Sequence, residues 1–168
     1  MEASEAIKSN QVVLVVMPPQ KYAQKLPEML KDLGEANVEY VTLNKPHSTV
    51  LQNLKKSGVE TKGFFFIDAT GKKERSENCT AVDSPTDLIQ LDITMFEIIG
   101  QKKPKLVVFD SITTLAIYND EMSVLKFVHG IATKIRDTEA KLLLPCLGDE
   151  STLVKDSSMF VDAVVKIE

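Results

Sequence analysis

Short apolar runs alternate with amphipathic segments along the whole sequence, and this alternation constrains the fold more than any other feature. Apolar, largely β-branched or aromatic runs predict strands at Val12–Val16, Val38–Leu43, Phe64–Ile67, Leu106–Phe109, Leu142–Leu147 and Ala163–Ile167. Segments with helical spacing separate them, at about 22–33, 48–56, 84–99, 123–138 and 151–158. Strands that are apolar on both faces and joined by helices predict a mostly parallel sheet covered on both sides. We therefore expect one α/β domain over residues 1–168, a three-layer αβα arrangement.

Local signals refine this scheme at three places. Pro27 lies inside the first helical stripe and predicts either a kink or a helix that begins near Leu26. Residues 69–83 are polar and predict a surface loop. Ser84 followed by Pro85 predicts a helix start with Ser84 as its cap.

Composition excludes several classes of protein. The longest apolar runs fall far short of the ~20 residues of a membrane helix, and the first residues lack the pattern of a signal peptide, so we expect a cytoplasmic protein with no membrane contact. A net charge of −4 and 6% aromatic residues argue against a nucleic-acid partner. Cys79 and Cys146 form neither a disulfide framework nor a metal-binding pattern.

Two carboxylates follow apolar strands directly, Asp68 and Asp110. Because the carboxyl ends of parallel strands meet at one edge of a sheet, both side chains are expected at one crevice, together with residues 44–47 and 148–150. One interpretation is a metal or phosphate site. The other is that Asp110 or Ser111 only caps the helix that follows.

The loop after the first strand argues against an ordinary phosphate site. A phosphate cradle needs consecutive backbone N–H groups, and glycines usually supply the conformation. Here the strand leads into Pro18 and Pro19, which have no N–H to donate, and no glycine precedes Gly34. No segment matches G-x-x-x-x-G-K-[ST].

The segment Lys105–Asn119 (KLVVFDSITTLAIYN) resembles the second ATPase motif of the RecA superfamily, particularly of its KaiC-like archaeal and bacterial branch. Further stretches resemble a small group of uncharacterised archaeal KaiC-like proteins: Val12–Pro19, Tyr40–Ser48, Phe64–Asp68 and Ser84–Leu88. The resemblance covers nearly the whole chain and implies a RecA-like fold.

This resemblance gives individual residues a role. Asp110 matches the aspartate that organises Mg²⁺ in the family, and Ser111 matches the hydroxyl after it. Active members carry paired glutamates just after the second strand, where this chain has Asn44 and Lys45. Neither an amide nor an ammonium group replaces a carboxylate as general base. With the phosphate loop also missing, the resemblance implies a degenerate ATPase with no catalytic residue and no cofactor.

Three hypotheses follow. The first is a non-catalytic RecA-like module that acts through protein association, with itself or with a true ATPase, since RecA-like domains commonly form rings or filaments. The second is an unconventional nucleotide-binding protein or weak Mg²⁺-dependent NTPase that uses Mg²⁺ and ATP, with Asp110, Ser111, Asp68 and Lys45 as candidate site residues. The third, a phosphoacceptor switch, lacks the acidic pair expected after the first strand. In the first case, Tyr22 and His47 are candidates to fill the crevice.

Overall fold

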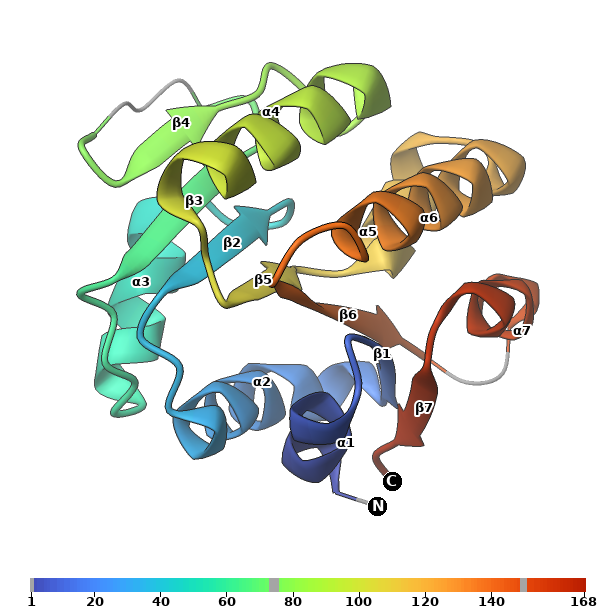
Figure 1. The fold of residues 1–168 in the computed structure, drawn as a ribbon, viewed down its shortest axis with the longest axis horizontal. Coiled ribbons are helices and arrows are strands. Elements are labelled where there is room, and N and C mark those ends of the chain that lie inside the picture. Colours follow the sequence, from blue (N-terminus) through green and yellow to red (C-terminus); the bar gives the residue numbers. More distant parts are fainter. Residues whose placement is uncertain (1, 73–75, 149–150) are drawn as a thin grey trace.

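The computed structural model describes residues 2–72, 76–148 and 151–168. In this part of the chain seven strands form one sheet in the order β4–β3–β2–β5–β6–β1–β7, and every neighbouring pair is parallel (Figure 1). The strands are β1 (Val12–Met17), β2 (Val38–Thr42), β3 (Phe64–Asp68), β4 (Cys79–Ala81), β5 (Leu106–Phe109), β6 (Lys141–Leu147) and β7 (Ala163–Lys166). The predicted α/β class and three-layer arrangement are confirmed.

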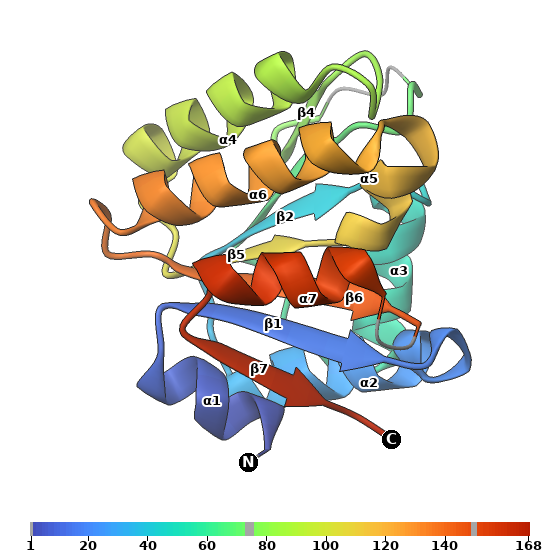
Figure 2. The same ribbon diagram turned by 90° about the vertical axis from the view of Figure 1, so that its right-hand side faces the viewer.

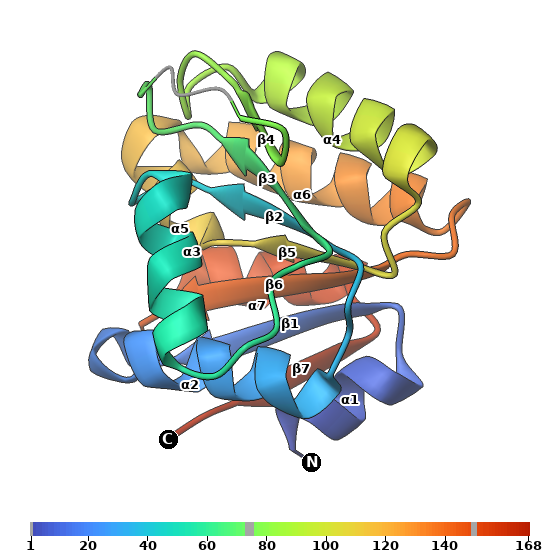
Figure 3. The ribbon, with the colours of Figure 1, turned by 90° about the vertical axis from the view of Figure 1, so that its left-hand side faces the viewer.

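Helices cover both faces of the sheet (Figures 2 and 3). One face carries α1 (Ala3–Ser9), α2 (Pro19–Leu33) and α3 (His47–Lys56). The other face carries α4 (Leu88–Lys102), α5 (Ile112–Tyr118), α6 (Glu121–Ile135), α7 (Thr152–Ser157) and the short 3₁₀ helix η1 (Ser158–Phe160). No helix in the described residues has both the length and the apolar character that a membrane crossing requires.

The sheet separates two apolar cores because successive side chains of a strand point to opposite faces. In β1, Val12, Leu14 and Val16 belong to the core under α4 to α7, while Val13 and Val15 belong to the core under α1 to α3. All six residues of β1 are buried, which is the pattern of a central strand in a parallel sheet.

The structure corrects the predicted helix starts. The helix predicted to begin at Ser84 begins at Leu88 instead, because Asp87 accepts a hydrogen bond from the backbone N–H of Gln90 (3.0 Å) and is the cap. The first long helix, α2, begins at Pro19, and Pro27 lies in its interior. Burial of Leu26 and neighbouring apolar residues against the sheet holds this helix together across the proline.

The sequence patterns did not predict several other elements of the structure. Strand β4 lies inside the segment predicted to be a loop, where it pairs with β3 over only three residues. Helices α1 and α5 have seven residues each and are too short to show a clear helical period. Residues 73–75 of the predicted loop lie outside the described residues, as do residues 149–150 of the sheet edge.

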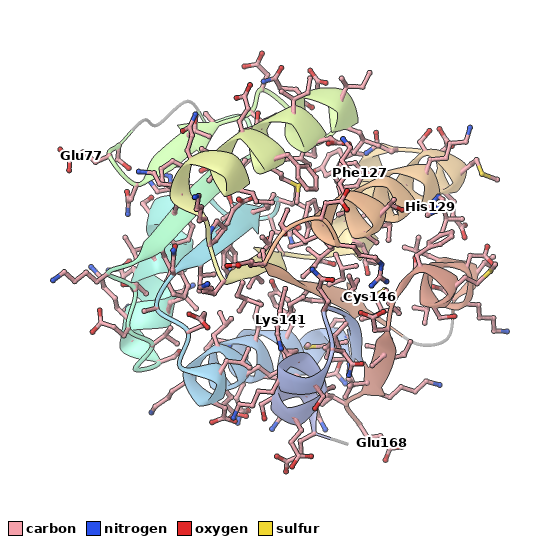
Figure 4. The ribbon with its side chains drawn as sticks, in the orientation of Figure 1. Glu77, Phe127, His129, Lys141, Cys146 and Glu168 are labelled. Atoms are coloured by element: carbon pink, nitrogen blue, oxygen red, sulfur yellow. The ribbon has the colours of Figure 1, made fainter. Side chains whose placement is uncertain are left out.

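At the amino-terminal ends of the strands, side chains donate hydrogen bonds to backbone carbonyls and stabilise the connections there. Lys141, labelled in Figure 4, donates from Nζ to the carbonyls of Ile7 and Lys8 at the end of α1 (2.6 Å each). Gln11 Nε2 is within 3.1 Å of three carbonyl oxygens around the α6–β6 connection. The other group of polar side chains lies at the carboxyl edge of the strands.

Candidate functional site

The connection between β1 and α2 is one residue long. Strand β1 ends at Met17, Pro18 adopts an extended conformation (φ −62°, ψ 140°), and Pro19 is the first residue of α2. The first turn of α2 is closed by the Lys21 N–H, which donates to the Pro18 carbonyl (3.0 Å). This short connection places Tyr22 next to the end of β5.

Asp110 immediately follows β5 and is 4% exposed. Its Oδ2 accepts hydrogen bonds from the backbone N–H groups of Leu43 and Asn44 and from the Asn44 amide, each at 3.2 Å. The Tyr22 hydroxyl contacts Oδ1 and lies 2.9 Å from the Asp110 backbone carbonyl. Internal donors from α2 and from the β2–α3 loop therefore surround this carboxylate.

Helix α5, on the other face of the sheet, holds Asn44 in place. Thr114 in α5 donates from its hydroxyl to the Asn44 side-chain oxygen (2.9 Å). That bond fixes the amide so that its nitrogen faces Asp110. The result is a continuous chain of hydrogen bonds from Thr114 through Asn44 and Asp110 to Tyr22.

A cavity of about 540 Å³ opens beside this network, between α2 and α3. Its walls are mainly apolar, and Tyr22, Tyr40, Asn44, Lys45 and Asp110 contribute its polar groups. Burial raises the pKa of the Tyr22 hydroxyl far above its ordinary value, and the nearby Tyr40 and Asp110 add to the effect. Burial likewise raises the pKa of Tyr40. Both hydroxyls therefore stay protonated, and Tyr22 remains a hydrogen-bond donor toward Asp110.

Asp68 belongs to a separate cluster and does not line this cavity. Its Oδ2 accepts a hydrogen bond from the backbone N–H of His47 (2.9 Å) and lies 3.3 Å from His47 Nδ1. Its Oδ1 accepts from the backbone N–H (2.9 Å) and the hydroxyl (2.6 Å) of Thr70. Burial alone would raise the pKa of Asp68, but these hydrogen bonds outweigh burial and hold the pKa below its usual range. The carboxylate satisfies the first turn of α3, where negative charge is favoured.

Ser111 occupies the position before α5 but forms no side-chain cap. Its hydroxyl is fully buried and has no hydrogen-bond partner among the described residues. Of the four predicted site residues, the structure thus places Asp110 and Lys45 at one cavity, and Asp68 and Ser111 away from it. Of the two residues considered as candidates to fill the crevice, Tyr22 contacts Asp110 and lines the cavity, and His47 contacts Asp68.

Sequence reasoning missed Tyr40 and Thr114 as members of the site, and it placed Asn44 at the edge without its role as a support of Asp110. Tyr40 reads as an ordinary strand residue, and the roles of Asn44 and Thr114 as supports of Asp110 depend on segments 70 residues apart meeting at the sheet edge. No spacing in the sequence signals that meeting. Only the polar character of Asn44, directly after a buried strand, was a local sign.

This fold and site define a RecA-like α/β domain, and comparison with known proteins gives its family. The family model described as the ATPase KaiC matches residues 25–145, so the chain belongs to the KaiC family of ATPase domains. No curated protein matches the chain.

Solved structures support the same fold. The chain is similar to the KaiC-like protein PH0186 from the hyperthermophilic archaeon Pyrococcus horikoshii OT3, with a TM-score of 0.66 and 14% sequence identity. The similarity covers 94% of this chain and 72% of that one. At this identity the likeness concerns the fold alone.

Proposed function

We propose that this chain is a KaiC-family domain that does not hydrolyse nucleotide and acts through association with protein, either a second copy of itself or an active ATPase. The observation that carries the proposal is the environment of Asp110. In place of an open carboxylate at the sheet edge, the chain has a buried one whose oxygens face donors from Tyr22, Leu43 and Asn44.

The residues present do not fit a bound Mg²⁺. This ion takes oxygen ligands in near-ideal octahedral geometry and keeps several waters, so its carboxylate ligand needs free lone pairs and room. Three hydrogen bonds use the lone pairs of Asp110 Oδ2, and the Tyr22 hydroxyl stands against Oδ1. Asp110 therefore offers no site for a Mg²⁺-dependent reaction step.

The two neighbouring connections support the same proposal. Pro18 alone joins β1 to α2, which leaves no stretch of backbone N–H groups to surround a phosphate. After β2 the chain carries Asn44 and Lys45, neither of which is a general base for water. The family match begins at Lys25, so it includes Asp110 but not the β1–α2 connection.

Exposed apolar side chains support association. Ile89 and Ile93 of α4, Ile117 and Tyr118 of α5, and Met122 of α6 form what we term the corner patch, and all five are exposed. A hydrogen bond from the Asn119 amide to the Pro85 carbonyl (3.1 Å) joins the end of α5 to the segment before α4. It links the α4 part of the patch to the part on α5 and α6. Exposed apolar patches often mark protein contacts, and we infer that these five side chains together form one.

A second candidate function is unconventional nucleotide binding. The cavity beside Asp110 is of a size typical of small-molecule sites, and Lys45 at its edge offers a positive charge. In this alternative a base would enter the apolar part of the cavity, and Lys45 would meet the phosphates.

Titration calorimetry distinguishes the two candidates. We expect no saturable heat when the protein is titrated with ATP, ADP or GTP in Mg²⁺ up to millimolar concentration. An active KaiC-family ATPase with a glycine-rich phosphate loop serves as the positive control. Saturable micromolar binding that is lost in a Lys45→Ala variant would overturn the non-catalytic proposal and support the alternative.

A further inference from the structure

A cluster of three potential metal ligands lies on the α3 side of the sheet, apart from the Asp110 cavity. His47 begins α3, Asp68 ends β3 and Cys79 begins β4. One ligand atom from each residue lies within 4.8 Å of the corresponding atoms of the other two. All three residues are buried, with at most 6% of any of them exposed.

The chemistry of the set is specific. An imidazole nitrogen, a thiol sulfur and a carboxylate oxygen are the three donor types that zinc takes from proteins. Mg²⁺ and Ca²⁺ prefer oxygen donors only, so the presence of Cys79 and His47 argues against those ions. Zinc sites with three protein ligands keep a fourth position for water.

The distances between the ligand atoms suit tetrahedral coordination of a zinc ion. Bond lengths of about 2.0–2.3 Å from zinc to nitrogen, oxygen and sulfur place neighbouring ligand atoms roughly 3.3–3.6 Å apart. His47 Nδ1 and Asp68 Oδ2 are already 3.3 Å apart. The Cys79 sulfur, which contacts the Thr80 carbonyl at 3.6 Å, lies within 4.8 Å of the other two ligand atoms and therefore needs to approach them by at most about 1.5 Å.

The carboxylate is also oriented in advance. Two hydrogen bonds from Thr70 hold Asp68 Oδ1, which turns Oδ2 toward His47. Outer partners of this kind position the ligating carboxylates of metal sites. Phe66 packs beside the His47 ring at 6.0 Å between ring centres and restricts that ring as well.

We propose that His47, Asp68 and Cys79 bind one zinc ion. On binding, the Cys79 thiol loses its proton and ligates as thiolate, and the imidazole ligates as the neutral form. The ion ties together three segments that are distant in sequence. Strand β4 is an edge strand that pairs with β3 over three residues only, and the zinc ion adds a link from it to β3 and α3.

Cobalt titration of the full chain, freed of metal with a chelator, tests this proposal. Co²⁺ bound by a thiolate gives a sulfur-to-metal charge-transfer band in the near ultraviolet. We expect one equivalent of Co²⁺ to develop this band and Zn²⁺ to remove it by displacement. The Cys79→Ser variant should lose the band, and His47→Gln should weaken metal affinity at least about tenfold.

Cys146 supplies the matched control. This second cysteine, labelled in Figure 4, is buried in β6, where its sulfur contacts the Thr113 hydroxyl (3.3 Å). The Cys146→Ser variant should keep the band unchanged. Circular dichroism verifies that each variant folds, and zinc should raise the unfolding temperature of the wild type and of Cys146→Ser but not of Cys79→Ser. Absence of the band in the folded wild type, or its persistence in Cys79→Ser, would overturn the proposal.

Discussion

The buried carboxyl groups of this molecule differ in whether neighbouring residues donate hydrogen bonds to them. Asp68 ends β3, Asp110 immediately follows β5, and both accept hydrogen bonds from neighbouring segments. Glu39, the second residue of β2, is fully buried beside the strand residues Phe65 and Val107, and its carboxyl oxygens have no partner among the described residues. Burial raises the pKa of the Glu39 carboxyl well above its usual range, so this side chain keeps its proton to a higher pH in the folded protein than in the unfolded chain.

Glu39→Gln is therefore expected to stabilise the protein at neutral pH. Above about pH 4.5 the unfolded chain releases this proton while the folded chain retains it, so the Glu39 contribution to stability falls as pH rises toward the folded pKa. Glutamine has nearly the same shape and no proton to lose. Urea unfolding should show a gain of at least ~1 kcal/mol at pH 7 and no gain near pH 4.

The control for this comparison is Glu97→Gln, which changes a glutamate of α4 that is not buried. It should change the free energy of unfolding by less than about 0.5 kcal/mol at either pH. A wild type that is as stable as Glu39→Gln across the pH range would show that Glu39 finds a compensating partner in solution.

At the scale of elements, the ends of α4, α5 and α6 present the corner patch, and the prediction concerns self-association. Ile89 and Ile117 are 77% and 75% exposed. Because association follows mass action, the sedimentation coefficient of the wild type should rise over about a hundredfold increase in protein concentration, without nucleotide. The double variant Ile89→Glu with Ile117→Glu should remain a monomer.

Met159→Gln is the matched control, since Met159 is equally exposed but lies on η1, outside the patch. It should associate as the wild type does. If the wild type sediments as a monomer at every concentration, self-association is excluded and a different protein must be the partner. If both variants associate alike, the contact lies elsewhere on the surface.

At the scale of the whole molecule, the apolar runs were enough to predict the parallel sheet and its three layers. Long buried strands such as β1 and β6 carry a strong local signal, whereas β4 depends on pairing with β3 and carries almost none. The positions of Asp110 and Lys45 at the carboxyl edge could also be predicted, because each lies just after a strand. The support of Asp110 by Asn44 and the approach of Cys79 to His47 could not be predicted from the sequence, because those contacts arise only when distant segments meet.

The network from Thr114 to Tyr22 joins the two faces of the sheet at this edge. We infer that Asp110 is retained for structure, because it accepts charge-assisted hydrogen bonds that hold α2, the β2–α3 loop and β5 together. A carboxylate kept instead for a bound metal is a cost to stability when no metal is present, and its neutralisation then tends to stabilise.

The free energy of unfolding of Asp110→Asn, measured in urea without nucleotide or Mg²⁺, tests this structural role most directly. The role predicts a loss of about 1–3 kcal/mol relative to the wild type, because the charged acceptor of several buried donors is removed. Tyr22→Phe should lower stability by a smaller amount, and the double variant should fall short of the sum because the two side chains share one contact. An Asp110→Asn protein that is as stable as the wild type, or more stable, would contradict the structural role and favour Asp110 as a metal ligand.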